Sequence, residues 1–105
     1  MPDMQNGRRR YQVHCSGVIA EALRQLQRRA RGTTRKKAIA LAFKRIVERL
    51  ERAPTQFGEP CYRLPSMRLQ VRSCSVSPLI VHFAVYEVQP LVFIKAVRLL
   101  SERRN

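Results

Sequence analysis

The spacing of the apolar residues changes once along the chain, at Pro54, and this change most constrains the fold. Before Pro54, apolar residues recur three and four residues apart from Ile19 to Ala53, which is the period of amphipathic helices. From Met67 to Val97 they alternate with polar residues or form short apolar runs, which is typical of strands. A helical half followed by a strand half predicts an α+β domain whose helices pack on one face of a sheet.

The helical half predicts an antiparallel hairpin. Ser16 is a favourable N-cap for a first helix, and Gly32 is a stop signal at its end. Thr33 or Thr34 can cap a second helix that ends before Pro54. The apolar stripes are Ile19, Ala22, Leu23, Leu26 and Ala30 in the first helix, and Ile39, Ala42, Phe43, Ile46, Leu50 and Ala53 in the second. Two such helices joined by a short turn form a helical hairpin.

The strands are expected on both sides of this hairpin. A short strand at 11–15 precedes it, a loop at 56–60 follows it, and three further strands begin near 67, 79 and 91. The order is β-α-α-β-β-β, with the last three strands in an antiparallel meander and the last covered on both faces. We expect a flexible segment at 1–9, one domain at 10–100 and a basic tail at 101–105. The expected core includes Leu23, Leu26, Phe43, Ile46, Leu50, Leu69, Val71, Val81, Phe83, Phe93 and Ile94.

The chain is strongly basic. Its 105 residues include 21 Lys or Arg against 7 Asp or Glu, which gives a formal net charge of +14. The sequence pI is near 11.4, and a pI above about 9 is typical of nucleic-acid-binding domains. Charge of this size repels itself and costs folding stability, a cost that a bound polyanion would relieve. We therefore expect a polyanionic partner, namely a nucleic acid or a ribonucleoprotein.

The positive charge is concentrated in the helices, because no acidic residue occurs between Ala22 and Val47. Arg35, Lys36 and Lys37 fall in the first turn of the second helix, where the helix dipole disfavours cations by about 0.3–1 kcal/mol each. The same position favours a bound anion. A solvated charge run is the alternative, but the absence of acids favours polyanion binding. The predicted nucleic-acid contacts are Arg24, Arg28, Arg29, Arg31, Arg35, Lys36, Lys37, Lys44 and Arg45.

Strand periodicity predicts a second cationic surface. If Met67, Leu69 and Val71 face the helices together with the odd-numbered residues of 79–85, then Arg68, Gln70, Arg72, His82 and Tyr86 share the opposite face. Such a set could hold a phosphate, stack a base and transfer a proton. The candidate catalytic residues are therefore Arg68, Arg72, His82 and Tyr86, and a solvated basic sheet face is the alternative.

The cysteines indicate the compartment. Cys15, Cys61 and Cys74 are odd in number and lack CxxC spacing, which does not indicate a disulfide framework. A zinc site would need these cysteines to converge with His14 or His82 from distant segments, and buried free thiols are the favoured interpretation. We expect no metal site and no cofactor. No apolar stretch approaches the roughly 18 residues of a membrane span, and no apolar run precedes Arg8 as in a signal peptide. A cytoplasmic protein with no membrane contact is expected.

Short motifs accompany this element order: Phe57-Gly58-Glu59-Pro60, Tyr62-Arg63-Leu64, the strand 67–72, and the final strands 79–83 and 91–94. Over about residues 11–100 the chain resembles the RelE/ParE superfamily of toxin–antitoxin toxins. The resemblance implies an antiparallel sheet with a helical hairpin on one face. One branch of the superfamily cuts messenger RNA on the ribosome without metal, using Arg, Lys and Tyr or His on the open sheet face. Another poisons DNA gyrase, and an antitoxin protein neutralises both.

The catalytic positions of the superfamily are only partly matched. Arg68 stands at a matching position, whereas Ile80 and Gln70 stand where many members carry Arg, and Leu99-Leu100 stands at the place of a His-Arg ending. Three functions follow from the resemblance. They are a metal-free endoribonuclease that uses Arg68, Arg72, His82 and Tyr86, a non-catalytic RNA-binding module, and a gyrase-directed toxin.

Overall fold

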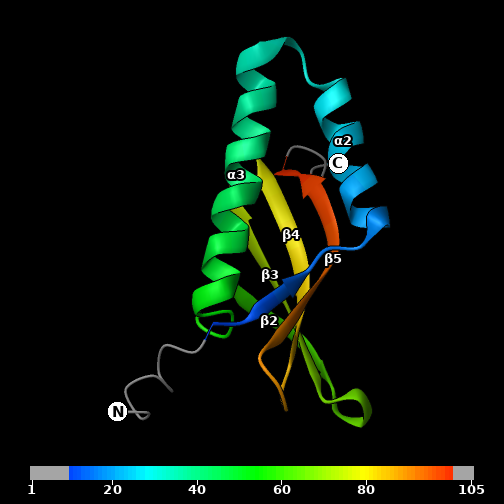
Figure 1. Ribbon diagram of the computed structural model, residues 1–105, viewed down its shortest axis with the longest axis vertical. Coiled ribbons are helices and arrows are strands. Elements are labelled where there is room, and N and C mark those ends of the chain that lie inside the picture. Colours follow the sequence, from blue (N-terminus) through cyan, green and yellow to red (C-terminus); the bar gives the residue numbers. More distant parts are fainter. Residues whose placement is uncertain (1–9, 101–105) are drawn as a thin grey trace.

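The structure, a computed structural model, describes residues 10–100. The predicted segment 1–9 and tail 101–105 lie outside the described residues. The elements are β1 (Gln12–His14), α2 (Gly17–Arg29), α3 (Gly32–Arg52), β2 (Glu59–Leu64), a 3₁₀ turn (Pro65–Met67), β3 (Leu69–Val76), β4 (Leu79–Tyr86) and β5 (Leu91–Leu99). The α+β class is confirmed, with both helices on one face of a single sheet (Figure 1).

The five strands form one mixed sheet in the order β1-β5-β4-β3-β2. The meander of β3, β4 and β5 is antiparallel, as predicted. The expectation of a wholly antiparallel sheet is wrong, because β1 pairs in parallel with β5, with Val13 opposite Val92. Parallel strands need a long connection between them, and the helical hairpin with three strands provides it.

The sequence pattern does not predict the strand β2, whose first residues fall in the loop expected at 56–60. It lies at the edge of the sheet and pairs with β3 from Glu59–Ser73 to Leu64–Leu69. Five of its six residues are exposed, so it lacks the alternation of a half-buried strand. Its Pro60 has no N–H to donate, which an edge strand tolerates.

The first helix follows its predicted signals more closely than the second. Ser16 caps α2, and its Oγ accepts a hydrogen bond from the Ile19 N–H at 3.3 Å. The predicted threonine cap of α3 is wrong. Gly32 has φ of 82° and already begins α3, so that Arg31 is the N-cap residue and makes no side-chain cap bond. The turn therefore starts α3 before the chain reaches Thr33.

The helical hairpin extends beyond the end of the sheet, so its turn covers no strand (Figure 1). Residues 31–37 are consequently all exposed. Within residues 10–100, neither helix has the length and apolar composition needed to cross a bilayer.

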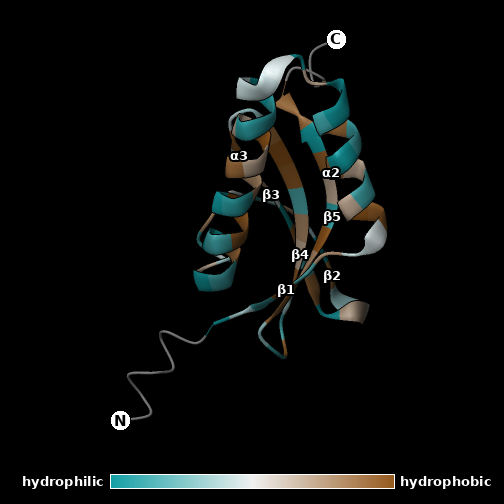
Figure 2. Cartoon of the chain, turned by 45° about the horizontal axis from the view of Figure 1, so that its top comes forward, coloured by the Kyte–Doolittle hydropathy of each residue, from teal (hydrophilic) through white to brown (hydrophobic). Residues whose placement is uncertain are grey.

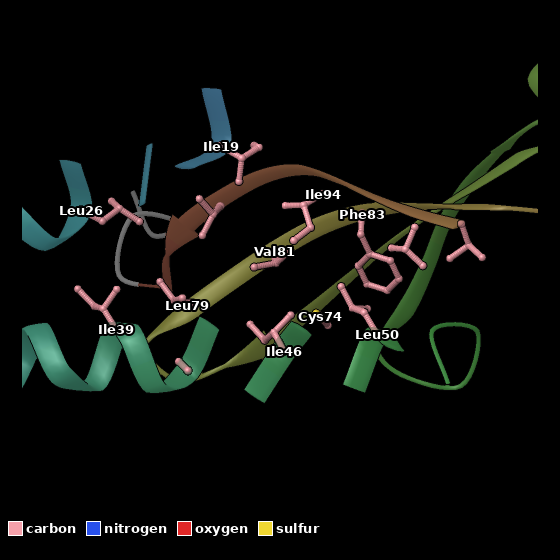
Figure 3. Packing of buried hydrophobic residues seen from close by; sticks show 14 residues of the cluster. Ile19, Leu26, Ile39, Ile46, Leu50, Cys74, Leu79, Val81, Phe83 and Ile94 are labelled. Carbon is pink, nitrogen blue, oxygen red and sulfur yellow. The ribbon is translucent and has the colours of Figure 1, made fainter. Parts of the chain in front are cut away.

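The core lies between the hairpin and the sheet (Figure 3). The completely buried residues of this core include Ile39, Ile46 and Leu50 of α3 and Val81 and Phe83 of β4. The hydrophilic sides of both helices face outward, while hydrophobic strands lie beneath them (Figure 2). Leu26, Ile46, Leu50, Val81, Phe83 and Ile94 are thus confirmed as core residues, and Leu23 and Phe43 pack against the core while partly buried.

The predicted facing of β3 is reversed. The hairpin turn at Ser77-Pro78 pairs Val76 with Leu79, and this register puts Arg72 opposite Phe83 on the helix-covered face. A shift of one residue in register moves every side chain of a strand to the other face. The even-numbered residues of β3 therefore face the helices, while Leu69 and Val71 lie on the other face.

Three further core predictions need correction for related reasons. Phe93 is opposite Ala84, on the face without helices, and is 37% exposed. The expectation that β5 is covered on both faces is therefore wrong. Leu69 is only half-buried, and Val71, although buried, lies outside the cluster between helices and sheet.

Candidate functional site

The face of the sheet opposite the helices, here called the open face, is divided into two halves. The half near the N-terminal end of β4 carries His82, Lys95 and Arg98. The other half carries Leu69 and Tyr86, which are directly opposite each other. One half is therefore cationic and the other apolar and aromatic. The cationic half lies at the end of the sheet beyond which the helical hairpin extends (Figure 1).

A hollow of about 310 Å³, here called the cationic pocket, lies in the cationic half. Its lining includes Cys61, Tyr62, Val71, His82, Lys95 and Arg98, which come from all strands except β1. The pocket combines an imidazole, a phenol, an ammonium and a guanidinium. These groups can hold an anion, donate hydrogen bonds to it and, through the imidazole, transfer a proton.

Two irregularities in strand pairing assemble this pocket. Lys95 and Arg98 are three residues apart, so a regular strand would place them on opposite faces. The pairing of β4 with β5 shifts so that Ala96 lies opposite His82 and Ile94 opposite Phe83, with Lys95 inserted between them. A second shift in β2, between Pro60 and Tyr62, lets Cys61 and Tyr62 line the same pocket. Bulges of this kind re-aim side chains and are common next to functional sites.

Aromatic side chains flank the pocket across the same row of the sheet. His14 of β1 stacks on Phe93 of β5, with ring centroids 5.3 Å apart and an angle of 23° between planes. Val71 and Ala84 separate Phe93 from Tyr62 on β2, which is 52% exposed. The open face therefore offers exposed rings on both sides of small, buried side chains. A row of this kind is suited to stacking planar ligands.

Arg72 does not belong to this site, contrary to the facing predicted from the sequence. It lies on the helix-covered face and is 7% exposed. Its Nη2 donates hydrogen bonds to the carbonyl oxygens of Gly58 at 3.2 Å and Phe57 at 3.5 Å, and its Nη1 donates to Gln70 Oε1 at 3.1 Å. Arg72 therefore anchors the loop that precedes β2, and Gln70 orients it.

The other predicted catalytic residues are not brought together either. Arg68 has φ of 55° at the junction before β3, and its carbonyl accepts the Glu87 N–H at 2.9 Å. His82 and Tyr86 do share the open face, but four residues of extended strand put their Cα atoms about 13 Å apart. The two side chains therefore cannot act as a close acid–base pair on one bond.

An exposed ion pair forms at the end of the sheet that carries Leu69 and Tyr86. Arg63 binds both carboxylate oxygens of Glu87. The hydrogen bond from Arg63 lowers the pKa of the Glu87 carboxyl, and the nearby charge of Arg68 lowers it further. Arg68 therefore acts in a local charge network at the apolar half, away from the cationic pocket.

The predicted basic surface of the helices is only partly available. Arg24 and Arg28 form ion pairs with Glu21, at 2.9 and 3.5 Å. Arg31, Arg35, Lys36 and Lys37, here called the hairpin tip, are all exposed where the hairpin passes the end of the sheet. Lys44 and Arg45 are exposed further along α3, and Arg29 lies on the last turn of α2. The N-terminal end of β4 points toward the hairpin turn (Figure 1), and the cationic pocket includes His82 from the N-terminal half of this strand.

Sequence reasoning missed Tyr62, Lys95 and Arg98. The available signal was the presence of two cations within the otherwise apolar segment 91–99. Regular alternation would have separated those cations, so only the observed bulge reveals the shared pocket.

The cysteines differ in environment. Cys74 is buried, and burial raises the pKa of its thiol to about 12. Cys15 and Cys61 are exposed, so the prediction of three buried thiols is wrong for these two. Among residues 10–100, no three His, Cys, Asp or Glu side chains gather in a way that could hold a metal ion.

Comparison with known proteins found no matching family model and no curated protein of significant similarity.

Proposed function

We propose that this protein binds single-stranded RNA on the open face of its sheet, with the hairpin tip adding phosphate contacts. The observation that carries the proposal is the cationic pocket beside a row of exposed aromatic rings. Lys95 and Arg98 would hold a phosphate, and Tyr62 or the His14–Phe93 stack would support a base. Base–aromatic stacking contributes about 1–3 kcal/mol per base in proteins that bind single strands.

The wider setting of the proposal is a divergent RelE/ParE-like protein that acts on RNA or the ribosome in the cytoplasm. The helical hairpin on one face of the sheet, the meander of β3, β4 and β5, and the net charge of +14 support it. An antitoxin protein is the partner that this setting implies. A gyrase-directed toxin would act through protein contacts, and a DNA supercoiling assay separates that alternative from RNA binding.

A second candidate function is metal-independent RNA cleavage in the cationic pocket. It is favoured by the position of His82, which lines the pocket together with two cations. The 2′-hydroxyl of the RNA would attack the adjacent phosphorus and release the 5′-oxygen, leaving a 2′,3′-cyclic phosphate and a 5′-hydroxyl. His82 would transfer a proton at one of these oxygens, and Lys95 and Arg98 would stabilise the additional negative charge. Arg72 has no part in this chemistry, since it is buried on the other side of the sheet.

The binding proposal is tested with two variants that each remove two positive charges. Lys95→Gln with Arg98→Gln alters the pocket, and Lys36→Gln with Lys37→Gln alters the hairpin tip. For the wild type, contact with about six phosphates gives a log–log salt slope of roughly −4 to −5. The tip variant and the pocket variant should each flatten this slope by about 1.4, because each removes two cations that contact phosphates. Wild-type binding by the pocket variant would refute the proposal.

The cleavage candidate is tested with ribosomes and messenger RNA in a buffer that contains a chelator. His82→Ala should abolish cleavage, and Tyr86→Phe should retain it, because Tyr86 lies outside the pocket. If wild-type protein binds RNA but yields no cyclic phosphate product, the protein is a binding module.

A further inference from the structure

A second polar surface lies on the opposite side of the sheet, along α3. Arg45, Arg49 and Arg52 line a hollow of about 330 Å³ together with Glu48 and Val76, here called the arginine cleft. We propose that RNA bound on the open face continues around the edge of β3 and places its next phosphates in the arginine cleft. This inference rests on the proposed function and extends it to a longer RNA-binding path.

Within residues 10–100, no strand pairs with the edge of β3 beyond Ser73, where the path would cross it. β3 continues to Val76, but β2 pairs with it only as far as Ser73. A hollow of about 360 Å³, here called the edge hollow, lies there, and its lining includes Phe57, Glu59, Ser73, Ser75 and Ile80. The serine hydroxyls can donate hydrogen bonds to a phosphate. Because β2 begins at Glu59, opposite Ser73, the edge hollow beyond this pair gives a strand of RNA room to turn.

The edge hollow connects the two cationic sites. Arg98 of the cationic pocket is directly opposite Ile80, which lines the edge hollow. On the other side, Ser75 of the edge hollow is followed by Val76 of the arginine cleft. Phe57 also joins these two sites, because its ring lies 5.2 Å below the Arg49 guanidinium. Neighbouring residues thus link the linings of the three hollows from one face of the sheet to the other.

The charges of the arginine cleft are available to a ligand. One side of α3 carries Arg45, Arg49 and Arg52, which occur four and three residues apart. Within residues 10–100, none of these arginines forms an ion pair. Glu48 contributes one negative charge, so these four side chains carry a net charge of +2. The Arg49 guanidinium carbon lies over the Phe57 ring at 5.2 Å from its centroid, a cation–π contact that makes no use of the guanidinium N–H groups, which can bind phosphate oxygens.

An acidic peptide is the other class of ligand that such a cleft could attract. The free edge of β3 comprises only three residues, 74–76, which is the lower end of the usual range of strand lengths. The edge therefore offers little backbone pairing to a peptide. Phosphates arriving from the cationic pocket, by contrast, need only side-chain contacts.

The test measures the affinity of labelled single-stranded RNAs of about 4, 8 and 16 nucleotides, which spans the site sizes of known single-strand binders. In the wild type, the longer RNAs should bind more tightly, and their salt slope should be steeper by about 1.4 if two more phosphates are engaged. Arg49→Gln with Arg52→Gln should weaken the longest RNA about tenfold and the shortest less than about threefold. Arg49→Lys should give part of this loss, because Lys keeps the charge but lacks the planar fork.

The matched control is Arg24→Gln with Arg28→Gln, which removes the same net charge from arginines paired with Glu21. It should weaken all three RNA lengths by a similar factor. The inference is overturned if the control shows the same selective loss for long RNA, or if the Arg49 and Arg52 variant binds long RNA as wild type does. It is also overturned if the change of Arg49 and Arg52 abolishes the binding of a polyglutamate peptide and leaves the affinity for long RNA unchanged.

Failure of the proposed function has a different signature. If the wild type binds no RNA of any length, both proposals fail. If short RNA binds through Lys95 and Arg98 and added length contributes nothing, the proposed function stands and only the path to the arginine cleft is refuted.

Discussion

Replacement of Gly58 by alanine should strongly destabilise the protein. Gly58 has φ of 80°, and an added Cβ would lie 2.1 Å from the carbonyl oxygen of Ser73 and 2.9 Å from Cys74 Cβ. The left-handed backbone alone costs roughly 1–2 kcal/mol for a residue with a side chain. The loop must also move by roughly 1 Å to reach a normal contact distance, and this movement weakens the hydrogen bond from Arg72 to the Gly58 carbonyl, worth about 1.5–3 kcal/mol. The expected loss is about 3–4 kcal/mol, measured by urea unfolding followed by circular dichroism.

Two other glycines separate these contributions. Gly32 has φ of 82° but nothing within 4 Å of an added Cβ, so Gly32→Ala should cost only the backbone strain, about 1–2 kcal/mol. Gly17 is the first residue of α2, its φ is not positive, and no atom lies within 4 Å of an added Cβ. Gly17→Ala should therefore be neutral or stabilise the protein by up to about 1 kcal/mol. If Gly58→Ala costs no more than Gly32→Ala, the close contact between the loop and β3 is refuted.

The remaining predictions concern the core and the thiols. Phe83→Ala should lower the free energy of unfolding by about 3–5 kcal/mol, because Phe83 is completely buried, and a melting temperature near that of the wild type would contradict its place in the core. Cys15 and Cys61 should react rapidly with a thiol reagent in the native protein, and Cys74 only after unfolding; three fast thiols would be inconsistent with its burial. Because burial raises the pKa of Cys74 to about 12, its thiol stays protonated up to pH 10 in the folded protein, whereas the same thiol ionises between pH 8 and pH 10 in the unfolded chain. Its contribution to stability should therefore decrease by ~1.4 kcal/mol between pH 8 and pH 10, measured as the difference in unfolding free energy from Cys74→Ala, which has no such titration.

The sequence predicts the elements of this fold because their signals are local. Ser16 caps its helix through a contact three residues away, and the stripes of α2 and α3 follow the period of a single helix. The strands β4 and β5 are evident from their apolar content. The missed strand β2 is held by pairing with β3 rather than by its own pattern, since its residues are almost all exposed.

For the candidate site, the prediction from the sequence differs from the structure in the face of the sheet that each side chain occupies. His82 and Tyr86 were identified because alternation within one strand places both on the open face. Arg72 was assigned to the wrong face, and Lys95 and Arg98 were overlooked, because their placement depends on register between strands. Composition indicated a basic binding surface, but it did not indicate which cations share a pocket.

The sequence by itself determined the helical hairpin, the antiparallel meander and the strong positive charge, because helix period, strand alternation and charge are properties of neighbouring residues. Only the tertiary structure decided which face each side chain occupies. The turn at Ser77-Pro78 sets the register of β3, and the bulge at Lys95 reverses alternation within β5. A single-residue change in register exchanges the two faces of a strand. The membership of the cationic pocket therefore follows from pairing between strands that lie far apart in the sequence.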